Sequence, residues 1–361
     1  MLEHGEREGD GVGVSIKEIA RLTGVSRGTV DRALNDRAGI DPAVKEKVLK
    51  VATEQGYRSN KAGRILGLRK KPLRIGVQMP SEGNDFFLGV RAGLERAVAA
   101  RADFGVSMAL RTMKGFDPTL QVRQVRDLLA EGIQALALVP ISHPDILALL
   151  EELHERHLPV LTVNTDIVGG KRLGYVGTDY LSSGLAAGGV LRLLADGRPL
   201  RVLVLTGSFR MLGHNQRVEG FRRALESSAP GLSILGVEET EDDDGIAYGK
   251  LSAALDRTPA PEAVYVAAGG VAGACRAIEE HGVAGIGPGR VRIIGNDLTP
   301  AIRDYLERGV LTATIGQQPF EQGYQAIRLL FDHHVDGTLP PDRTLTHNEI
   351  VIAENLKGGT P

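Results

Sequence analysis

The sequence contains few of the residues that mark several large protein classes. Tryptophan is absent, aromatic residues make up 4% of the 361 residues, and Cys275 is the single cysteine. One cysteine excludes an intrachain disulfide and fits a reducing compartment. Because hydrophobic residues still account for 42% of the chain, we expect large aliphatic cores of the α/β type.

Membrane and export signals are also missing. No run of about 18 apolar residues occurs. The first ten residues, MLEHGEREGD, are acidic and have no apolar stretch of the kind found in secretory signals. We therefore expect a cytoplasmic protein without a membrane partner.

Motifs for catalysis, nucleotides and metals are absent as well. The sequence has no GxxxxGK[ST] phosphate loop and no GxSxG nucleophile turn. The histidine pairs 154/157 and 333/334 lack a third ligand at metal-like spacing. We expect no cofactor, no metal site and no enzymatic activity.

Charge is distributed unevenly along the chain. Residues 14–71 contain fourteen lysines and arginines against six acidic residues, a net charge of +8, whereas residues 72–361 carry −7. A basic segment on an acidic body is typical of polyanion binding, although charge alone also fits a solvated surface. Residues 1–13 are predicted to be a disordered tail.

The basic segment has the pattern of a helix-turn-helix domain over residues 14–59. Ser15 and Glu18 have capping-box spacing, which predicts a helix to about Leu22, and residues 23–25 form a tight turn. Ser26 is a second N-cap and predicts a helix from Arg27 to about Asn35. A third helix begins at residues 41–42, where Asp precedes Pro. The second helix of such a unit enters the major groove of DNA.

These residues carry a family resemblance. The stretch VSIKEIARLTGVSRGTVDRALND, followed by VKEKVLKVATEQGYRSNKAGRILG, resembles the amino-terminal domain of the LacI/GalR (lactose-repressor) family of transcription regulators. In this chain Gly28 stands where the family often has a base-reading side chain. The resemblance implies a set of DNA-contacting residues: Ser15, Ser26, Arg27, Gly28, Thr29, Arg32, Asn35, Asn60, Lys61 and Leu66.

Residues 60–72 correspond to the hinge helix of that family. Gly63 and Gly67 make this short segment a poor isolated helix. It is expected to fold only on DNA, where by resemblance Leu66 wedges open a minor-groove base step. A basic linker is the alternative.

Residues 73–357 predict a two-lobed α/β body. Apolar runs such as RIGVQM, ALALVP, RVLVLTG and VRIIGND alternate with amphipathic helical stretches, which favours doubly wound parallel sheets covered on both faces. The number of such units indicates two sheets, with a cleft at the carboxyl ends of their strands.

The body resembles the effector domain of the same family and the periplasmic sugar-binding proteins of the ribose-binding type, a type I periplasmic-binding-protein fold. The resemblance implies three chain crossings, near Thr178, Gln317 and residue 342. The N-lobe is then about 73–178 plus 317–342, and the C-lobe about 179–316 plus 343–357.

Polar and aromatic residues follow several of the predicted strands, where they can meet in the cleft. By resemblance, a sugar-like effector is bound by Asn84, Phe86, Phe87, Asn164, Asn215, Asp297 and Gln317. Asn215 is expected to replace an arginine that is usual in the sugar binders, and Ala268–Gly270 replace an Asn-Asp pair. The acidic run EETEDDDG, residues 238–245, is interpreted as a solvated lobe edge.

The sequence thus predicts a bacterial, nucleoid-associated repressor of a carbohydrate or polyol operon. It is expected to bind operator DNA as a homodimer or tetramer, under control of a monosaccharide, polyol or related effector. A sugar-binding solute receptor without a DNA role and a carbohydrate-active enzyme are the alternatives.

Overall fold

The computed structural model describes residues 14–34, 39–55, 57, 72–80, 82–226, 231–287 and 289–356. The chain forms two compact units, Met1–Gly67 and Leu68–Pro361. The predicted tail, 1–13, and residues 60–71 of the predicted hinge lie outside the described residues.

The first unit contains three described helices: α1 (Ile16–Thr23), α2 (Arg27–Leu34) and α3 (Pro42–Glu54). The caps predicted from sequence are confirmed. The Ser15 side chain accepts from the backbone N–H of Glu18 at 3.3 Å, and Asp41 accepts from two N–H groups at the start of α3. Gly24 ends α1 with a φ of 73°, a left-handed conformation that glycine adopts without strain.

The three helices share a small apolar core. Ile19, Val30 and Val48, one from each helix, are completely buried. Ala20, Ala33 and Ala52 complete the core and let the helices approach one another. Of the apolar positions that helical spacing predicts for this core, these six are buried, whereas Val25, Leu34, Val44 and Val51 are only partly buried against it.

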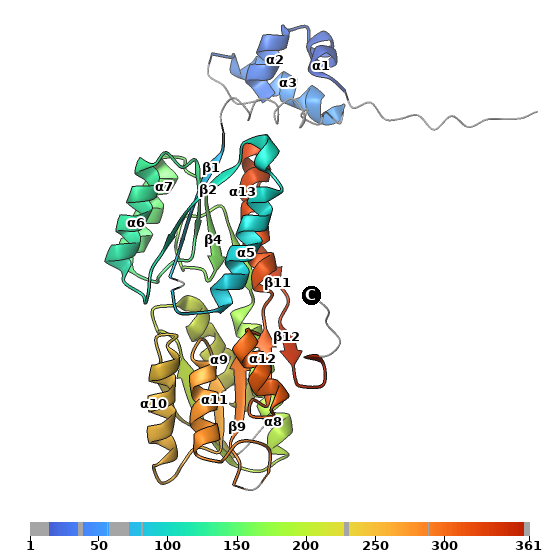
Figure 1. The fold of residues 1–361 in the computed structure, drawn as a ribbon. Helices are drawn as coiled ribbons and strands as arrows, with labels where there is room; N and C mark the ends of the chain where they lie inside the picture. Colours follow the sequence, from blue (N-terminus) through green and yellow to red (C-terminus); the bar gives the residue numbers. More distant parts are fainter. Residues whose placement is uncertain are drawn as a thin grey trace, which may run out of the picture. The chain divides into compact units, whose positions relative to one another are not determined.

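The second unit has two lobes, each built on a six-stranded sheet (Figure 1). The N-lobe sheet has the order β11-β5-β4-β3-β1-β2, and the C-lobe sheet has the corresponding order β12-β10-β9-β8-β6-β7. The N-lobe strands are β1 (Arg74–Met79), β2 (Ser107–Thr112), β3 (Ala135–Leu138), β4 (Val160–Asn164), β5 (Gly174–Thr178) and β11 (Arg343–Thr346). The C-lobe strands are β6 (Leu200–Thr206), β7 (Leu232–Glu239), β8 (Ala263–Val266), β9 (Arg292–Asn296), β10 (Ala313–Gly316) and β12 (Glu349–Val351).

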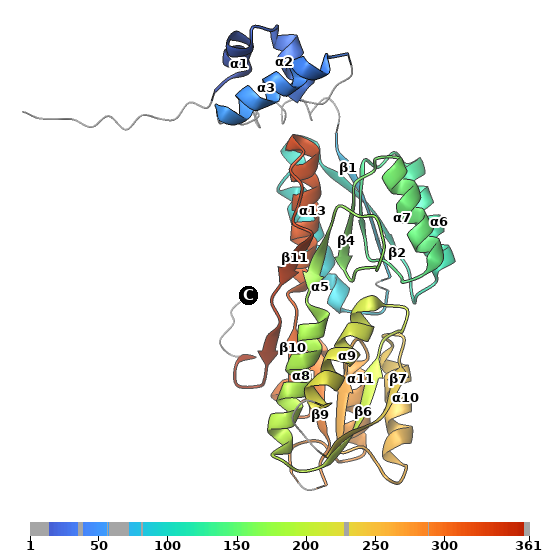
Figure 2. The ribbon, with the colours of Figure 1, turned by 180° about the vertical axis from the view of Figure 1, so that it is seen from behind.

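Helices cover both faces of each sheet (Figure 2). Those of the N-lobe are α5 (Phe86–Ala99), α6 (Pro118–Ala130), α7 (Pro144–Glu155), α13 (Pro319–Asp336) and the short 3₁₀ helix η1 (Ala102–Phe104). Those of the C-lobe are α8 (Tyr180–Ala195), α9 (Leu212–Glu226), α10 (Asp244–Leu255), α11 (Val271–Glu280) and α12 (Pro300–Glu307). Strands such as β3, β4 and β9 are buried along their whole length, as expected for parallel strands covered on both faces. The predicted α/β architecture with two mainly parallel sheets is confirmed.

The chain crosses between the lobes after β5, after β10 and between β11 and β12. The third crossing corrects the expectation of one near residue 342. Residues 343–346 form β11, which pairs in parallel with β5 of the N-lobe, and the chain reaches the C-lobe only at β12. The sequence analysis assigned residues 343–346, RTLT, to the C-lobe. As an edge strand this segment is largely exposed, so it lacks the continuous apolar run by which the buried strands were identified.

Two helix pairs approach closely through glycines. A Cβ on Gly184 of α8 would lie 2.0 Å from the carbonyl oxygen of Arg217 on α9, and one on Gly220 would lie 2.1 Å from that of Leu181. Gly93 of α5 and Gly323 of α13 make the same kind of contact. These helices can pack at this distance only because the glycines have no side chain.

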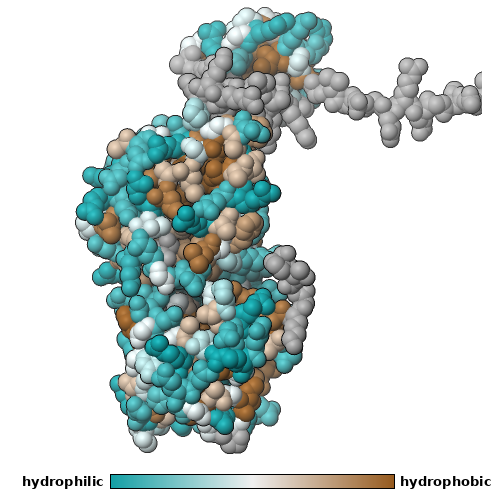
Figure 3. Space-filling model, in the orientation of Figure 1, coloured by the Kyte–Doolittle hydropathy of each residue, from teal (hydrophilic) through white to brown (hydrophobic). Residues whose placement is uncertain are grey.

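The face of the molecule in Figure 3 is mainly hydrophilic, with apolar residues scattered among polar ones. Within the described ranges, none of the helices combines the length and the apolar character that crossing a bilayer requires.

Candidate functional site

The first unit presents a polar face of α2. Ser26, Arg27, Gly28 and Arg32 are exposed, while the opposite side of the helix lies in the core. Ser26 accepts from the backbone N–H of Thr29 at 3.1 Å, and the two side-chain hydroxyls lie 2.8 Å apart. These hydroxyls therefore secure the start of α2, and the arginines are the groups that extend from it.

The other expected DNA contacts fall into two groups. Ser15 is exposed at the start of α1, where it caps the helix. Asn35, Asn60, Lys61 and Leu66 lie outside the described residues. At Gly28 a Cβ would meet only the Ser26 hydroxyl, at 3.8 Å, so the backbone has room for a side chain there.

In the second unit, a pocket lies between the lobes at the carboxyl ends of the strands. Six of the seven residues expected from the sequence line it: Asn84, Phe86, Phe87, Asn164, Asp297 and Gln317. Reasoning from sequence missed the other polar and aromatic lining residues, which are Phe116, Tyr180, His214, Arg217 and Asp242. The two phenylalanines of α5 are buried, with their rings edge to face at 5.2 Å.

Asn215 is the residue that the structure places elsewhere. It is exposed, and its side-chain amide donates to the carbonyl oxygen of Phe209 at 2.8 Å, outside the pocket lining. Met211, just before α9, and positions 214 and 217 of that helix face the pocket, because they are spaced by three residues. The expectation that this chain lacks an arginine in the cleft is therefore wrong, since Arg217 provides one.

Arg217 is held in place from several sides. Only 2% of the residue is exposed, and its guanidinium lies over the Tyr180 ring at 4.5 Å from the centroid. One terminal nitrogen donates to the carbonyl oxygen of Ala267 at 3.0 Å, and Nε donates to the Ser183 hydroxyl at 3.3 Å. The other terminal nitrogen, Nη2, is buried and has no hydrogen-bond partner among the residues that the structure describes.

Asp297 and Gln317 form the second fixed element of the pocket. The Gln317 amide donates to the Asp297 carboxylate at 2.5 Å, while the buried Gln317 oxygen Oε1 has no partner in the described part of the chain. Burial raises the pKa of Asp297, although Arg217 and the bond from Gln317 oppose the shift. The pocket thus contains an unused donor, Arg217 Nη2, and an unused acceptor, Gln317 Oε1.

The acidic run also contributes to the pocket, which corrects its interpretation as a solvated edge. The Asp242 carboxylate accepts from the N–H of Gly269 at 2.8 Å and from the Asn84 amide of the other lobe at 3.5 Å. Its neighbour Asp243 instead caps α10. The interpretation was wrong because the sequence does not show which carboxylates of a charged run face the pocket.

His214 adds a neutral ring to the wall. Its Nδ1 accepts from the N–H of Ser208 at 2.9 Å, and burial lowers its pKa. The hydrogen of the neutral ring is then on Nε2, which makes that nitrogen a donor. The Phe116 ring of the other lobe meets His214 edge to face at 6.2 Å.

Several hydrogen bonds join the lobes around the pocket. The N–H of Gly213 donates to the Thr165 hydroxyl at 3.0 Å, and the N–H of Ser142 donates to the carbonyl oxygen of Arg210 at 2.8 Å. The Arg210 guanidinium also donates to the carbonyl oxygen of Phe116 at 3.2 Å. The remaining space is about 20 Å³, with a further 110 Å³ in an adjoining cavity beside Asp242 and Asp297. The lobes are therefore closed upon each other.

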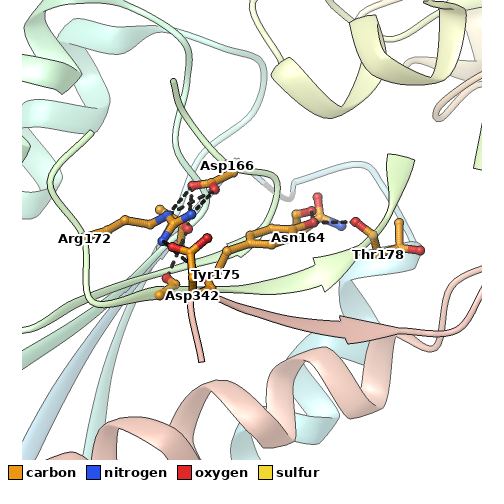
Figure 4. A network of polar contacts seen from close by, with 8 residues as sticks. Asn164, Asp166, Arg172, Tyr175, Thr178 and Asp342 are labelled. Carbon is orange, nitrogen blue, oxygen red and sulfur yellow. Dashed lines mark hydrogen bonds and ion pairs between the residues drawn. The ribbon is translucent and has the colours of Figure 1, made fainter. Parts of the chain in front are cut away.

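The segment that follows Asn164 is fixed by a polar network (Figure 4). Arg172 binds the Asp166 carboxylate with two nitrogens and reaches Asp342 at 2.7 Å. The buried Tyr175 hydroxyl donates to the carbonyl oxygens of Asn164 and Thr178, at 2.8 and 2.9 Å. The network thus ties one cleft residue to the first crossing and to the start of β11.

Comparison with known proteins matches both units. Residues 15–60 match the family described as bacterial regulatory proteins, lacI family, and residues 75–338 match the periplasmic binding protein domain. This chain belongs to the LacI family of regulators. The predicted resemblance is confirmed over both parts of the chain.

Among its relatives, the HTH-type transcriptional regulator CelR of Thermobifida fusca is 26% identical and covers 94% of this chain and 98% of its own length. Catabolite control protein A of Priestia megaterium is 28% identical and covers 88% of this chain and 91% of its own length. The crystal structure of GanP, a glucose-galactose binding protein from Geobacillus stearothermophilus, has a TM-score of 0.71 at 24% identity and covers 79% of this chain and 99% of its own. That likeness concerns the fold of the body.

Proposed function

We propose that this LacI-family regulator represses transcription by binding an operator with α2, and that a small sugar-like molecule held between its lobes controls the binding. The observation that carries the proposal is the interlobe pocket with its two unused polar atoms. Arg217 Nη2 can donate to a ligand oxygen, and Gln317 Oε1 can accept from a ligand hydroxyl. A hydroxyl-rich molecule satisfies both.

The remaining walls suit the same ligand class. Asp297 and Asp242 supply carboxylate acceptors, and neutral His214 supplies a donor. Phe86, Phe87 and Phe116 offer apolar faces for the C–H side of a ring. We therefore propose a monosaccharide, a polyol or a close relative, bound by Asn84, Phe86, Phe87, Asn164, Asp297 and Gln317 together with Arg217.

The effector has to enter by separation of the lobes. A space of about 20 Å³ has room for roughly one water molecule and is too small for a sugar. Because the interlobe bonds are few and polar, they can break and re-form at modest cost. Closure on the ligand then changes the orientation of the lobes, which is the conformational signal that we propose.

We propose a homodimer as the DNA-binding form. Exposed apolar side chains occur on α5, α8, α13, β11 and β12, and these elements lie along one long side of the body (Figures 1 and 2). They are Leu88, Leu193, Phe320, Leu345 and Ile350. A two-fold interface here brings two first units to the two halves of a near-palindromic operator in the bacterial cytoplasm.

A thermal-shift screen over sugars and polyols, followed by gel shifts on the DNA upstream of the gene, tests the proposal. We expect at least one compound to raise the melting temperature of the protein and to change its affinity for that DNA. Couplings between two such sites are typically about 1–3 kcal/mol. Ligand binding with no sequence-selective DNA binding would instead favour a sugar receptor, and turnover of a sugar would favour an enzyme.

A further inference from the structure

The C-lobe has a second cavity at the amino ends of its strands, opposite the interlobe pocket. Its volume is about 420 Å³. It lies where β6, β8 and β9 begin, and four arginines line it: Arg198, Arg201, Arg290 and Arg292. One carboxylate, Glu262, shares the lining.

Arg292 is the unusual member of this group. Only 3% of the residue is exposed, and its buried Nε has no hydrogen-bond partner within the described ranges. Within the described part of the chain, its guanidinium has no hydrogen bond or ion pair to a protein group. A buried cation without a counterion is strongly unfavourable unless an anion compensates it.

The other arginines leave most of the positive charge unbalanced. Arg201 is paired with Glu262, at 3.4 Å between Nη1 and Oε2. Arg198 and Arg290 donate to main-chain carbonyl oxygens, those of Ala195 and Gly282. Three guanidinium groups are thus without a carboxylate partner among the described residues, and each retains N–H groups for a ligand.

We propose that this cavity binds the phosphate group of a small molecule. Guanidinium groups bind phosphate through paired N–H···O bonds, and a phosphate carries enough charge to balance more than one of them. Leu200, Leu255 and Val291 supply apolar walls in the same cavity. A cavity of 420 Å³ has space for an organic group beside the phosphate, since ligand pockets of about 300–1,000 Å³ are typical.

The site is separate from the proposed effector pocket. Strand β9 begins with Arg292 at the cavity and ends at Asn296, next to Asp297 of the interlobe pocket. The two ligands therefore occupy opposite ends of the same sheet. The phosphate site does not depend on the identity of the sugar or on DNA binding.

The test is a melting-temperature titration of the full-length protein with inorganic phosphate and with phenyl phosphate, against sodium chloride at equal ionic strength. We expect a rise of about 2 °C or more at saturation. Arg292→Met, which keeps the volume but removes the charge, is expected to abolish the rise. Arg223→Met is the matched control, because Arg223 is an exposed arginine of the same lobe that pairs with Glu219.

A larger rise with phenyl phosphate than with phosphate supports a phosphate ester as the ligand, and equal rises support free phosphate. No rise beyond that in sodium chloride overturns the proposal, and so does a rise that Arg292→Met leaves unchanged. If Arg292→Met does not fold, Arg198→Met and Arg290→Met replace it, and loss of the rise in both is the expected result. A rise retained in both contradicts the site.

Discussion

Asn164 and Asp297 occupy matching positions on the two walls of the interlobe pocket. Asn164 ends β4, Asp297 directly follows β9, and their φ angles are 64° and 72°. This left-handed conformation is costly for residues other than glycine. In each case a buried hydroxyl donates to the carbonyl oxygen of the strained residue, that of Tyr175 at 2.8 Å for Asn164 and that of Thr314 at 2.7 Å for Asp297. Each lobe thus holds a polar side chain in the pocket by the same means.

Asp297→Asn should separate ligand binding from stability. Burial raises the pKa of Asp297 above its ordinary 3.8, so the folded protein holds this proton more tightly than the unfolded chain. The free energy of unfolding therefore falls as the pH rises from the pKa of Asp297 in the unfolded chain through its raised pKa in the folded protein. We expect the variant to be at least as stable as wild type at pH 7, and the difference to shrink as the pH falls.

The same variant should bind the effector roughly 10- to 100-fold more weakly, because hydrogen bonds to charged groups contribute about 1.5–3 kcal/mol. Calorimetric titration with a compound from the sugar screen measures this loss. Unchanged affinity would remove Asp297 from the binding site.

Gly184→Ala should displace α9 and the arginine that it carries. The added Cβ would lie 2.0 Å from the carbonyl oxygen of Arg217, so the two helices have to move apart. We expect a loss of stability of about 1–3 kcal/mol and weaker effector binding, measured by denaturant titration and calorimetry.

Gly189→Ala on the same helix is the control. Its Cβ meets nothing within 4 Å, and alanine is favoured over glycine in a helix by about 0.5–1 kcal/mol. A Gly184→Ala variant as stable as this control would contradict the packing.

Thr165→Val should favour the open arrangement of the lobes. The Thr165 hydroxyl accepts from the N–H of Gly213 across the pocket, and both groups are buried. Valine leaves this N–H without a partner in the closed form, at a cost of about 1–3 kcal/mol, whereas water can reach it in the open form. Small-angle X-ray scattering should show a larger radius of gyration, and effector affinity should fall. Thr119→Val, at an exposed position of α6, should change neither quantity.

Arg27→Ala should relax operator specificity at one base pair in each half-site. An arginine at the start of the second helix can bind guanine through two hydrogen bonds, and its removal typically costs about 1–3 kcal/mol. Binding to a set of operator variants measures the preference at each position. Arg223→Ala, at an exposed arginine on α9 of the second unit, should leave every preference unchanged. An Arg27→Ala protein with the wild-type preference would argue against base contact.

The sequence was sufficient to predict the helix caps. It was not sufficient to predict which individual side chains point into the interlobe pocket. Ser15, Asp41 and Gly24 cap their helices as their residue types predict. Asp297 and Gln317 were assigned to the pocket by resemblance to the sugar binders, and both directly follow buried strands at the carboxyl end of the sheet. Arg217 and Asp242 were missed because their roles depend on which turn of α9 and which residue of an acidic loop face the pocket. Which side chains face the pocket is determined by tertiary packing between segments that are far apart in the sequence.

The most direct test of the central claim is a fluorescence-anisotropy titration of the purified protein on its own upstream DNA, with and without a compound that raises its melting temperature. The account predicts sequence-selective binding that weakens steeply with salt and shifts by roughly 5- to 150-fold when the compound is added. Binding to that DNA no tighter than to a scrambled sequence, or an affinity that the compound leaves unchanged, would contradict it.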